Sequence, residues 1–223
     1  MRKGTPSRQR GRWYTLAMND KSLMRAAVLE RRDAIPEEER ARRSEKICRD
    51  LACLAKAFCP CEAKGAAESP PLVAAYAAMR SEVNLDAFVR DMQTRGWTVC
   101  FPCMVRDRSQ QKPRMEFFRV PPERMSHARR AFLSHPLCCF SSDELDSAGY
   151  ALAEPRDLDF VAVPLVAFDR MGGRLGYGGG NYDRLLPKLR PDALAVGVAF
   201  VEQRVRSVPR DHHDVPLSRV ISA

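Results

Sequence analysis

Residues 159–186 read DFVAVPLVAFDRMGGRLGYGGGNYDRLL, a strand pattern followed by a glycine-rich loop and the start of a helix. The apolar run at 159–163 is typical of a buried strand, which 166–169 can extend beyond Pro164. Six of the chain's 12 glycines then fall within residues 172–183, and 182–186 has a helical pattern. A loop in this position lies at the carboxyl end of the sheet, where open α/β folds bind ligands.

The glycine-rich segment predicts a phosphate site. Glycine loses more conformational freedom on folding than any other residue, so six in twelve positions are unfavourable unless bare backbone must approach a ligand. Successive N–H groups in a tight loop bind anions, and the start of a helix adds to the attraction. The segment fits neither standard nucleotide fingerprint, GxxxxGK[ST] or GxGxxG after a strand. The alternative, a mobile surface loop, is disfavoured by the accompanying Arg174, Tyr177, Tyr182 and Asp183.

Strand and helix patterns alternate along the rest of the chain. Helices are expected over 20–33, from Pro36 to before Cys59, and over 85–95, where Gly96 gives a stop signal. Buried strands are expected over 72–78, 97–101 (stopped by Pro102), 115–120 and 193–200. We expect a linker at 63–71, a loop or hairpin at 106–114 and a surface segment at 121–157. This alternation predicts one α/β domain over 20–223, with a parallel or mixed sheet and an N-terminal helical pair.

Composition limits the classes of function. The chain has 223 residues, 45% of them hydrophobic, and no apolar run approaches the roughly 18 residues of a membrane span. Residues 1–19 are basic and lack the apolar core of a signal peptide, so we expect a disordered extension, or a true start at Met18, and a cytoplasmic protein. A faint likeness to a mitochondrial presequence is the other interpretation.

The net charge of +9 is concentrated near the N-terminus. Residues 1–50 carry 14 Lys/Arg and 8 Asp/Glu, a balance of +6. No RNA-binding motif accompanies this charge, so it favours a small polyanion over nucleic acid as the partner. A solvated helix face is the alternative for most of these residues.

The chain has eight cysteines, which predict no disulfide framework in the absence of a secretory signal. Cys100 and Cys103 have CxxC spacing, and Cys59 and Cys61 could complete four thiolates. A zinc or redox site is therefore one interpretation. The strand pattern around Cys100 favours the other, in which these cysteines are small buried hydrophobes.

Four groups of charged residues are candidates for chemistry. Asp183 follows the glycines, where a carboxylate beside phosphates indicates Mg²⁺, although an acid in a first helical turn also stabilises the helix dipole. Asp214 ends the run Asp211-His-His-Asp214, which indicates a second magnesium ligand, a zinc site or a surface turn; adjacent histidines point to opposite faces, which disfavours zinc. Lys21 and Arg25 lie four apart on one helix face, as phosphate ligands or as solvated charges. Glu82 follows an expected strand and could accept a ligand's N–H groups or cap the next helix.

Together these segments resemble the 5-formyltetrahydrofolate cyclo-ligase (methenyltetrahydrofolate synthetase) family. The run over 168–186 carries the strongest likeness. Shorter matches follow in the family order: Lys21-x-x-x-Arg25, Met79-Arg-Ser-Glu82-Val, Glu154-Pro155, Val163-Pro164, Phe200-x-x-Gln203 and Pro209-x-x-x-His213-Asp214. The likeness covers about residues 20–221. It implies a three-layer α/β sandwich similar to sugar-phosphate isomerases and coenzyme A transferases.

The resemblance also implies a reaction. ATP and Mg²⁺ would convert 5-formyltetrahydrofolate, with one or several glutamates, to 5,10-methenyltetrahydrofolate through an N5-imino phosphate, releasing ADP and phosphate. The implied enzyme is a monomer with neither membrane nor nucleic-acid partners. A non-catalytic nucleotide- or RNA-binding relative and an isomerase or transferase are the alternatives.

The resemblance assigns site residues by position. Arg174, Lys21 and Arg25 would be catalytic. The ATP site would comprise Lys21, Ser22, Leu23, Met24, Arg25, Arg174, Leu175, Gly176, Tyr177, Gly178, Gly179, Gly180, Asn181 and Tyr182. The folate site would comprise Ala77, Glu82, Tyr177, Gly178, Gly179, Gly180 and Asn181. Asp183 and Asp214 would hold Mg²⁺. Asn181 departs from the family pattern, in which an aromatic residue is usual, and Ser218 stands where an acid is common.

Overall fold

The computed structural model describes residues 21–59, 70–106, 112–136 and 138–223. The expected N-terminal extension at 1–19, the Asp20 cap, Cys61 and most of the 63–71 linker lie outside the described residues. Within them, no helix has the length and apolar character needed to cross a membrane.

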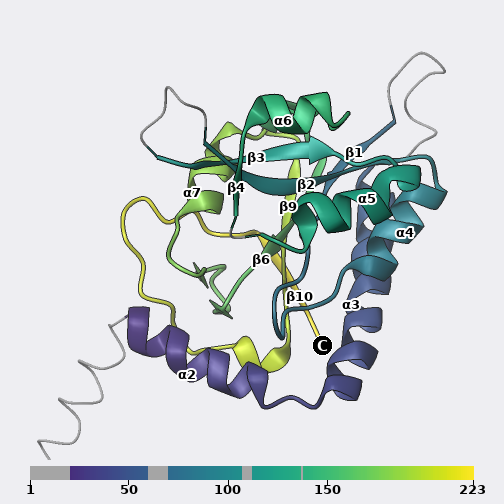
Figure 1. Cartoon of the computed structure of the whole chain (residues 1–223). Helices are drawn as coiled ribbons and strands as arrows, with labels where there is room; N and C mark the ends of the chain where they lie inside the picture. Colours follow the sequence, from purple (N-terminus) through teal and green to yellow (C-terminus); the bar gives the residue numbers. More distant parts are fainter. Residues whose placement is uncertain (1–20, 60–69, 107–111, 137) are drawn as a thin grey trace, which may run out of the picture.

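The centre of the molecule is a mostly parallel eight-stranded sheet (Figure 1). Its order is β10 (Arg219–Ser222), β9 (Leu194–Ala199), β6 (Phe160–Pro164), β1 (Leu72–Ala74), β2 (Thr98–Val105), β3 (Arg114–Arg119) and β5 (Leu152–Ala153), and β4 (Cys139–Phe140) pairs with β2. The pairs β2–β3 and β3–β5 are antiparallel, and the other pairs are parallel. The expectation of an α/β fold with a mostly parallel or mixed sheet is confirmed.

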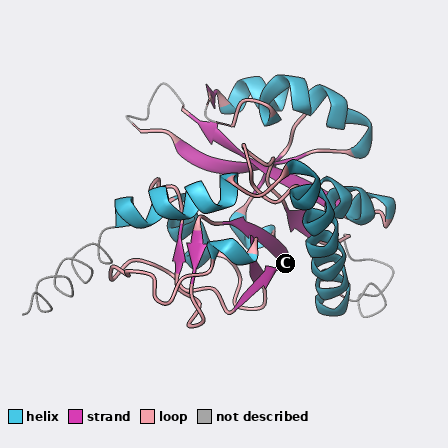
Figure 2. Ribbon diagram, turned by 90° about the horizontal axis from the view of Figure 1, so that it is seen from below, coloured by secondary structure: helices cyan, strands magenta, loops and turns pink. Residues whose placement is uncertain are grey.

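Helices cover both faces of this sheet (Figure 2). Phe160 and Ala162 of β6 pack into a core shared with α3 (Glu37–Phe58), α4 (Asp86–Thr94), α5 (Met125–Ala128) and η3 (Arg129–Leu133). Val161 and Val163 pack on the other face, with α7 (Asn181–Leu185) and η5 (Leu186–Lys188). Side chains alternate along a strand, so apolar residues at every position of β6 bury both faces, as is usual for parallel sheets.

The N-terminal helix α2 (Lys21–Asp33) packs beside a small second sheet. That sheet pairs β7 (Ala167–Phe168) with β8 (Arg174–Leu175) in antiparallel register. Residues 166–169 therefore do not extend the main strand, which corrects the sequence interpretation. Instead they form a hairpin with the first part of the glycine-rich segment.

Two further expectations about local structure are wrong, and one strand was not expected. β2 continues through Pro102 to Val105. Alternate residues of β2 turn their backbone N–H toward β1. Pro102 lies beyond the last β1 partner, Ala74, so the N–H that a proline lacks would have no partner there. No ladder hydrogen bond is lost, and the proline is tolerated. Residues 121–157 form α5, η3, β4, α6 (Ser142–Ser147) and β5, with Phe132 and Tyr150 fully buried. The C-terminal strand β10 was not expected at all.

Candidate active site

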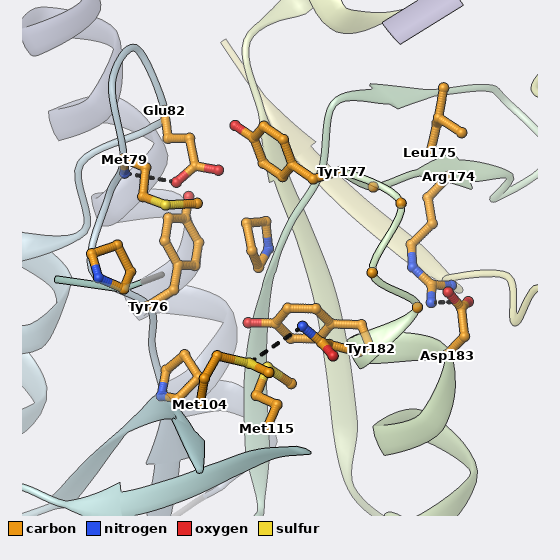
Figure 3. Close-up of a pocket in the computed structure, with 18 of the residues that line it drawn as sticks. Tyr76, Met79, Glu82, Met104, Met115, Arg174, Leu175, Tyr177, Tyr182 and Asp183 are labelled. Carbon is orange, nitrogen blue, oxygen red and sulfur yellow. Dashed lines mark hydrogen bonds and ion pairs between the residues drawn. The ribbon is translucent and has the colours of Figure 1, made fainter. Parts of the chain in front are cut away.

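A cavity of about 580 Å³ opens at the carboxyl end of the parallel strands. Tyr76 follows β1, Pro164 ends β6, and Met104 lies near the end of β2, so three neighbouring strands deliver residues to one place. The glycine-rich segment forms the opposite wall (Figure 3). This is the position predicted for the ligand site.

The glycine loop, residues 176–180, has a backbone that side chains would disturb. Gly178 and Gly180 have φ of 105° and 62°, in the range that L-residues rarely adopt. Gly180 is also the N-cap of α7. A Cβ at Gly176 would meet no heavy atom within 4 Å, so that position is open rather than packed. The glycine there is required by neither strain nor crowding from other protein atoms.

Cations from α2 face this loop. The Arg25 Nε donates to the Gly176 carbonyl oxygen at 2.7 Å, and the guanidinium lies against Gly178. Lys21, one turn earlier, donates to Asp211 at 2.8 Å and to Asp214 at 2.5 Å. Both line the cavity. Ser22 and Leu23 are exposed, and Met24 packs against a small core around Val28; none of these three lines the cavity, and their assignment to the ATP site stays a prediction.

The two predicted magnesium ligands are already paired with cations. Asp183 accepts from Arg174 Nη2 at 2.5 Å, and Asp214 accepts from Lys21. The Val215 N–H also donates to Asp183 at 3.3 Å, which brings the two acids' segments together. Burial opposes ionisation of Asp214, but the hydrogen bond from Lys21 and the Asp211 N–H outweigh it and lower the pKa of that carboxyl group. Burial also lowers the pKa of Arg174. Lys21 and Arg174 therefore balance the charges of Asp214 and Asp183.

These acids fit a hard divalent cation. Oxygen ligands on carboxylates are what Mg²⁺ prefers, and it binds typically through one or two carboxylates plus phosphate oxygens. Ligand atoms of Asp211, His213 and Asp214 lie within 4.8 Å of one another, and Asp183 is not in this group, so its place as a magnesium ligand stays a prediction. His212 is not in this group, as expected for adjacent side chains pointing apart. Within the described residues, no cysteine joins a cluster of possible metal ligands.

Glu82 occupies the other end of the cavity (Figure 3). Its side chain is buried, with 8% of its surface exposed. One carboxylate oxygen, Oε2, accepts from the Met79 N–H at 2.8 Å, and the other, Oε1, has no hydrogen-bond partner. Burial raises the pKa of Glu82, and the Met79 N–H, the Tyr177 hydroxyl and the Arg32 charge act against this rise. An unpartnered buried acceptor beside a cavity indicates a ligand with N–H donors.

Apolar side chains line the space between these two ends. Asn181, where the sequence departs from its family pattern, also lines the cavity, and its Nδ2 lies 3.7 Å from the Met104 sulfur. The Asn181 Oδ1 accepts from Arg184 at 2.6 Å. The flat aromatic and the flexible methionine side chains of this wall suit an aromatic ligand. The apolar wall comprises Tyr76, Ala77, Met79, Pro102, Met104, Met115, Phe132, Leu133, Pro164 and Tyr182.

Sequence reasoning missed most of this wall and also Arg32. Met104, Met115 and Phe132 lie in segments without a recognisable motif, and they meet only through the sheet order. Cys103 lines the cavity as a buried residue, and burial raises its pKa to about 12, as expected for a cysteine acting as a hydrophobe. Burial likewise raises the pKa of Cys100.

Comparison with known proteins identifies relatives over nearly the whole chain. The model of the 5-formyltetrahydrofolate cyclo-ligase family matches residues 17–223. The 5-formyltetrahydrofolate cyclo-ligase of Mycolicibacterium smegmatis is 24% identical over 93% of this chain and 95% of its own length. That of Haemophilus influenzae is 46% identical over 66 residues, which is 29% of this chain and 35% of the relative.

Two solved structures share the fold. A 5,10-methenyltetrahydrofolate synthetase from Mycoplasma pneumoniae superposes with a TM-score of 0.64 at 23% identity, covering 91% of this chain and 98% of the other. The synthetase from Aquifex aeolicus gives 0.61 at 28% identity, covering 91% and 89%. The similarity to sugar-phosphate isomerases and coenzyme A transferases stays a prediction.

Proposed function

Because the chain belongs to the 5-formyltetrahydrofolate cyclo-ligase family of ligases, we propose that it converts 5-formyltetrahydrofolate and ATP to 5,10-methenyltetrahydrofolate, ADP and phosphate. One observation supports this assignment above the others. A single cavity has a cationic end with a bare glycine backbone and, across an apolar wall, a buried acceptor at Glu82. The first end suits a triphosphate, and the second suits a reduced pterin with its N–H donors.

The chemistry requires the formyl oxygen to become a leaving group. In the proposed sequence, this oxygen attacks the γ-phosphorus of ATP, the bond from that phosphorus to ADP breaks, and an N5-imino phosphate forms. N10 then attacks the formyl carbon and loses its proton. The carbon–oxygen bond breaks, the methenyl bridge closes, and phosphate leaves with the former formyl oxygen.

The protein's contribution is to position the reactants and offset charge, as is usual in phosphoryl transfer. Lys21, Arg25 and Arg174 would bind the phosphates, and the open backbone at Gly176 lets a phosphate approach. Asp183 and Asp214 would hold Mg²⁺, which neutralises phosphate charge when bound. Glu82 would accept from the pterin, so that the formyl group faces the glycine loop.

The test is to mix the purified protein with 5-formyltetrahydrofolate, ATP and Mg²⁺ and follow the near-ultraviolet absorbance of methenyltetrahydrofolate. We expect this absorbance to grow only when all three are present. We also expect Asp183→Ala to abolish turnover, whereas Asp50→Ala, an exposed acid on α3 paired with Lys46, leaves it unchanged. A wild-type protein that gives no product while binding ATP would support a non-catalytic relative instead.

A further inference from the structure

One face of α2 runs from the acids at one end of the site toward the turn that carries Glu82 at the other. Lys21, Arg25, Val28 and Arg32 are spaced i, i+4, i+7 and i+11, which places them within about 60° on the helix. Between the first and last of them the helix rises about 17 Å. Lys21 reaches the acids, Arg25 reaches the glycine loop, and Arg32 reaches the end that contains Glu82. The assignments above give roles to the first two cations but not to Arg32.

Arg32 is a buried arginine that joins two distant segments. Only 1% of its surface is exposed. Its Nε donates to the Ser81 hydroxyl at 2.9 Å, and its Nη2 donates to the Tyr177 hydroxyl at 3.0 Å. Ser81 directly precedes Glu82 and in turn donates to Asp33. One guanidinium therefore fixes the turn that carries Glu82 relative to the glycine loop that carries Tyr177.

The same guanidinium supplies charge opposite Glu82. Burying a cation is costly unless an anion compensates it, and burying a carboxylate is costly unless a cation compensates it. The Met79 N–H, Tyr177 on the glycine loop and Arg32 on α2 act on Glu82, and Glu82 in turn acts on Tyr76 after β1 and Tyr182 on α7. Of these groups, Arg32 is the one that carries a positive charge at neutral pH.

We propose that Arg32 is a positioning residue for the folate end of the site: it holds Tyr177 and the Glu82 turn at a fixed separation and supplies the countercharge to Glu82. This inference rests on the proposed function. Arg32 does not line the cavity, so it acts through Tyr177 and Glu82 rather than by touching substrate. Removing it affects recognition of the folate more than recognition of the nucleotide, which Arg25 and Lys21 contact.

The test compares Michaelis constants for the two substrates in the full chain. We expect Arg32→Met to raise KM for 5-formyltetrahydrofolate about 10-fold or more, because it removes charged hydrogen bonds. KM for ATP should stay within about twofold. Tyr177→Phe, which keeps the ring, should raise the folate KM by about 3- to 10-fold. Arg31→Met is the matched control: Arg31 is the exposed neighbour of Arg32, and its replacement should change neither constant.

A pH profile separates positioning from loss of structure. Without the Arg32 charge the pKa of Glu82 rises, so in Arg32→Met the folate KM should fall as the assay pH is raised. Arg32→Lys restores the charge but not the two-armed hydrogen bonding, so it should restore the wild-type pH profile while keeping a raised KM. Glu82→Gln should show a high folate KM at every pH.

Some results would overturn the inference. An equal rise in both Michaelis constants, or a wild-type folate KM in Tyr177→Phe, would make Arg32 a structural residue only. If Arg32→Met shows no cooperative thermal transition, Tyr177→Phe and Ser81→Ala decide by the same measurement, since both leave Arg32 in place. If the wild type binds 5-formyltetrahydrofolate without turnover, the proposed function fails, and dissociation constants of the variants decide on Arg32. A wild type that does not bind the folate overturns both proposals.

Discussion

Gly172 and Gly176 both belong to the glycine-rich segment, yet the structure gives them different roles. Gly172 has φ of 74°, and a Cβ there would overlap the carbonyl oxygen of Leu217. The Leu217 N–H also donates to the Gly172 carbonyl at 2.9 Å, so the two backbones are joined. A Cβ on Gly176 would meet nothing within 4 Å. We therefore expect alanine to destabilise the protein at the first position and not at the second.

The size of the effect at Gly172 can be worked from its geometry. A left-handed backbone costs an L-residue about 1–2 kcal/mol. Moving the Leu217 backbone away weakens a hydrogen bond with a net contribution of about 1 kcal/mol. The free energy of unfolding should therefore fall by about 2–3 kcal/mol, which for a chain of this size lowers Tm by about 4–12 °C. Gly176→Ala should change Tm by no more than about 2 °C.

The assay is thermal and urea unfolding of both variants followed by circular dichroism, alongside turnover. Gly172→Ala should lose stability but keep turnover at a temperature where it is folded. Gly176→Ala should keep stability but bind ATP more weakly, because its methyl group occupies space left for a phosphate. Equal Tm values for the two variants, or a larger loss at Gly176, would refute the assignment of these glycines.

Three further predictions test other parts of the structure. Asp169→Asn should destabilise the fold by about 2–4 kcal/mol, because three backbone N–H groups donate to this buried carboxylate. Those N–H groups hold the pKa of Asp169 in the folded state below its unfolded value despite burial. The stabilisation that Asp169 gives is therefore present above about pH 4 and is lost as the pH falls through the folded-state pKa. Stability should depend less on acid pH in the variant, so its acid-unfolding curve should be flatter. Asn181→Tyr should lower the folate KM by about 2- to 10-fold by placing a ring opposite Met104, and an unchanged KM would contradict this. Iodoacetamide at mildly alkaline pH should label exposed Cys53 but spare Cys103, whose pKa is raised to about 12, as mass spectrometry of the peptides would show.

Features that depend on local chemistry could be predicted from the sequence. β6 was recognisable because burial on both faces leaves an uninterrupted apolar run. The glycine loop was recognisable because its backbone requires glycine at Gly178 and Gly180 whatever surrounds it. Helical spacing made Lys21 and Arg25 candidates, the family resemblance assigned them to the site, and the structure places both at the cavity.

Features that depend on distant segments could not be predicted. A proline usually predicts the end of a strand. Pro102 is tolerated within β2 because β1 ends early, at Ala74, and this depends on a distant segment. Arg32 carries no local signal, because a charged residue in a helix is usually solvated, and its burial comes from Ser81 and Tyr177. The hairpin of β7 with β8 likewise depends on a partner strand that itself begins inside the glycine-rich segment.

The ion pairs at the cationic end of the cavity bear on how the proposed ligands would bind. Lys21 and Arg174, which we propose bind phosphates, neutralise Asp214 and Asp183, which we propose hold the metal. A nucleotide that binds alone would pair with the two cations and leave the two carboxylates without a countercharge. A metal that binds alone would pair with the two carboxylates and leave the two cations without one. When both arrive together, each charge exchanges one partner for another and none is left unpaired in a partly buried site, where an unpaired charge is costly. We therefore expect nucleotide and metal each to raise the affinity for the other, and by linkage the two increases should be equal.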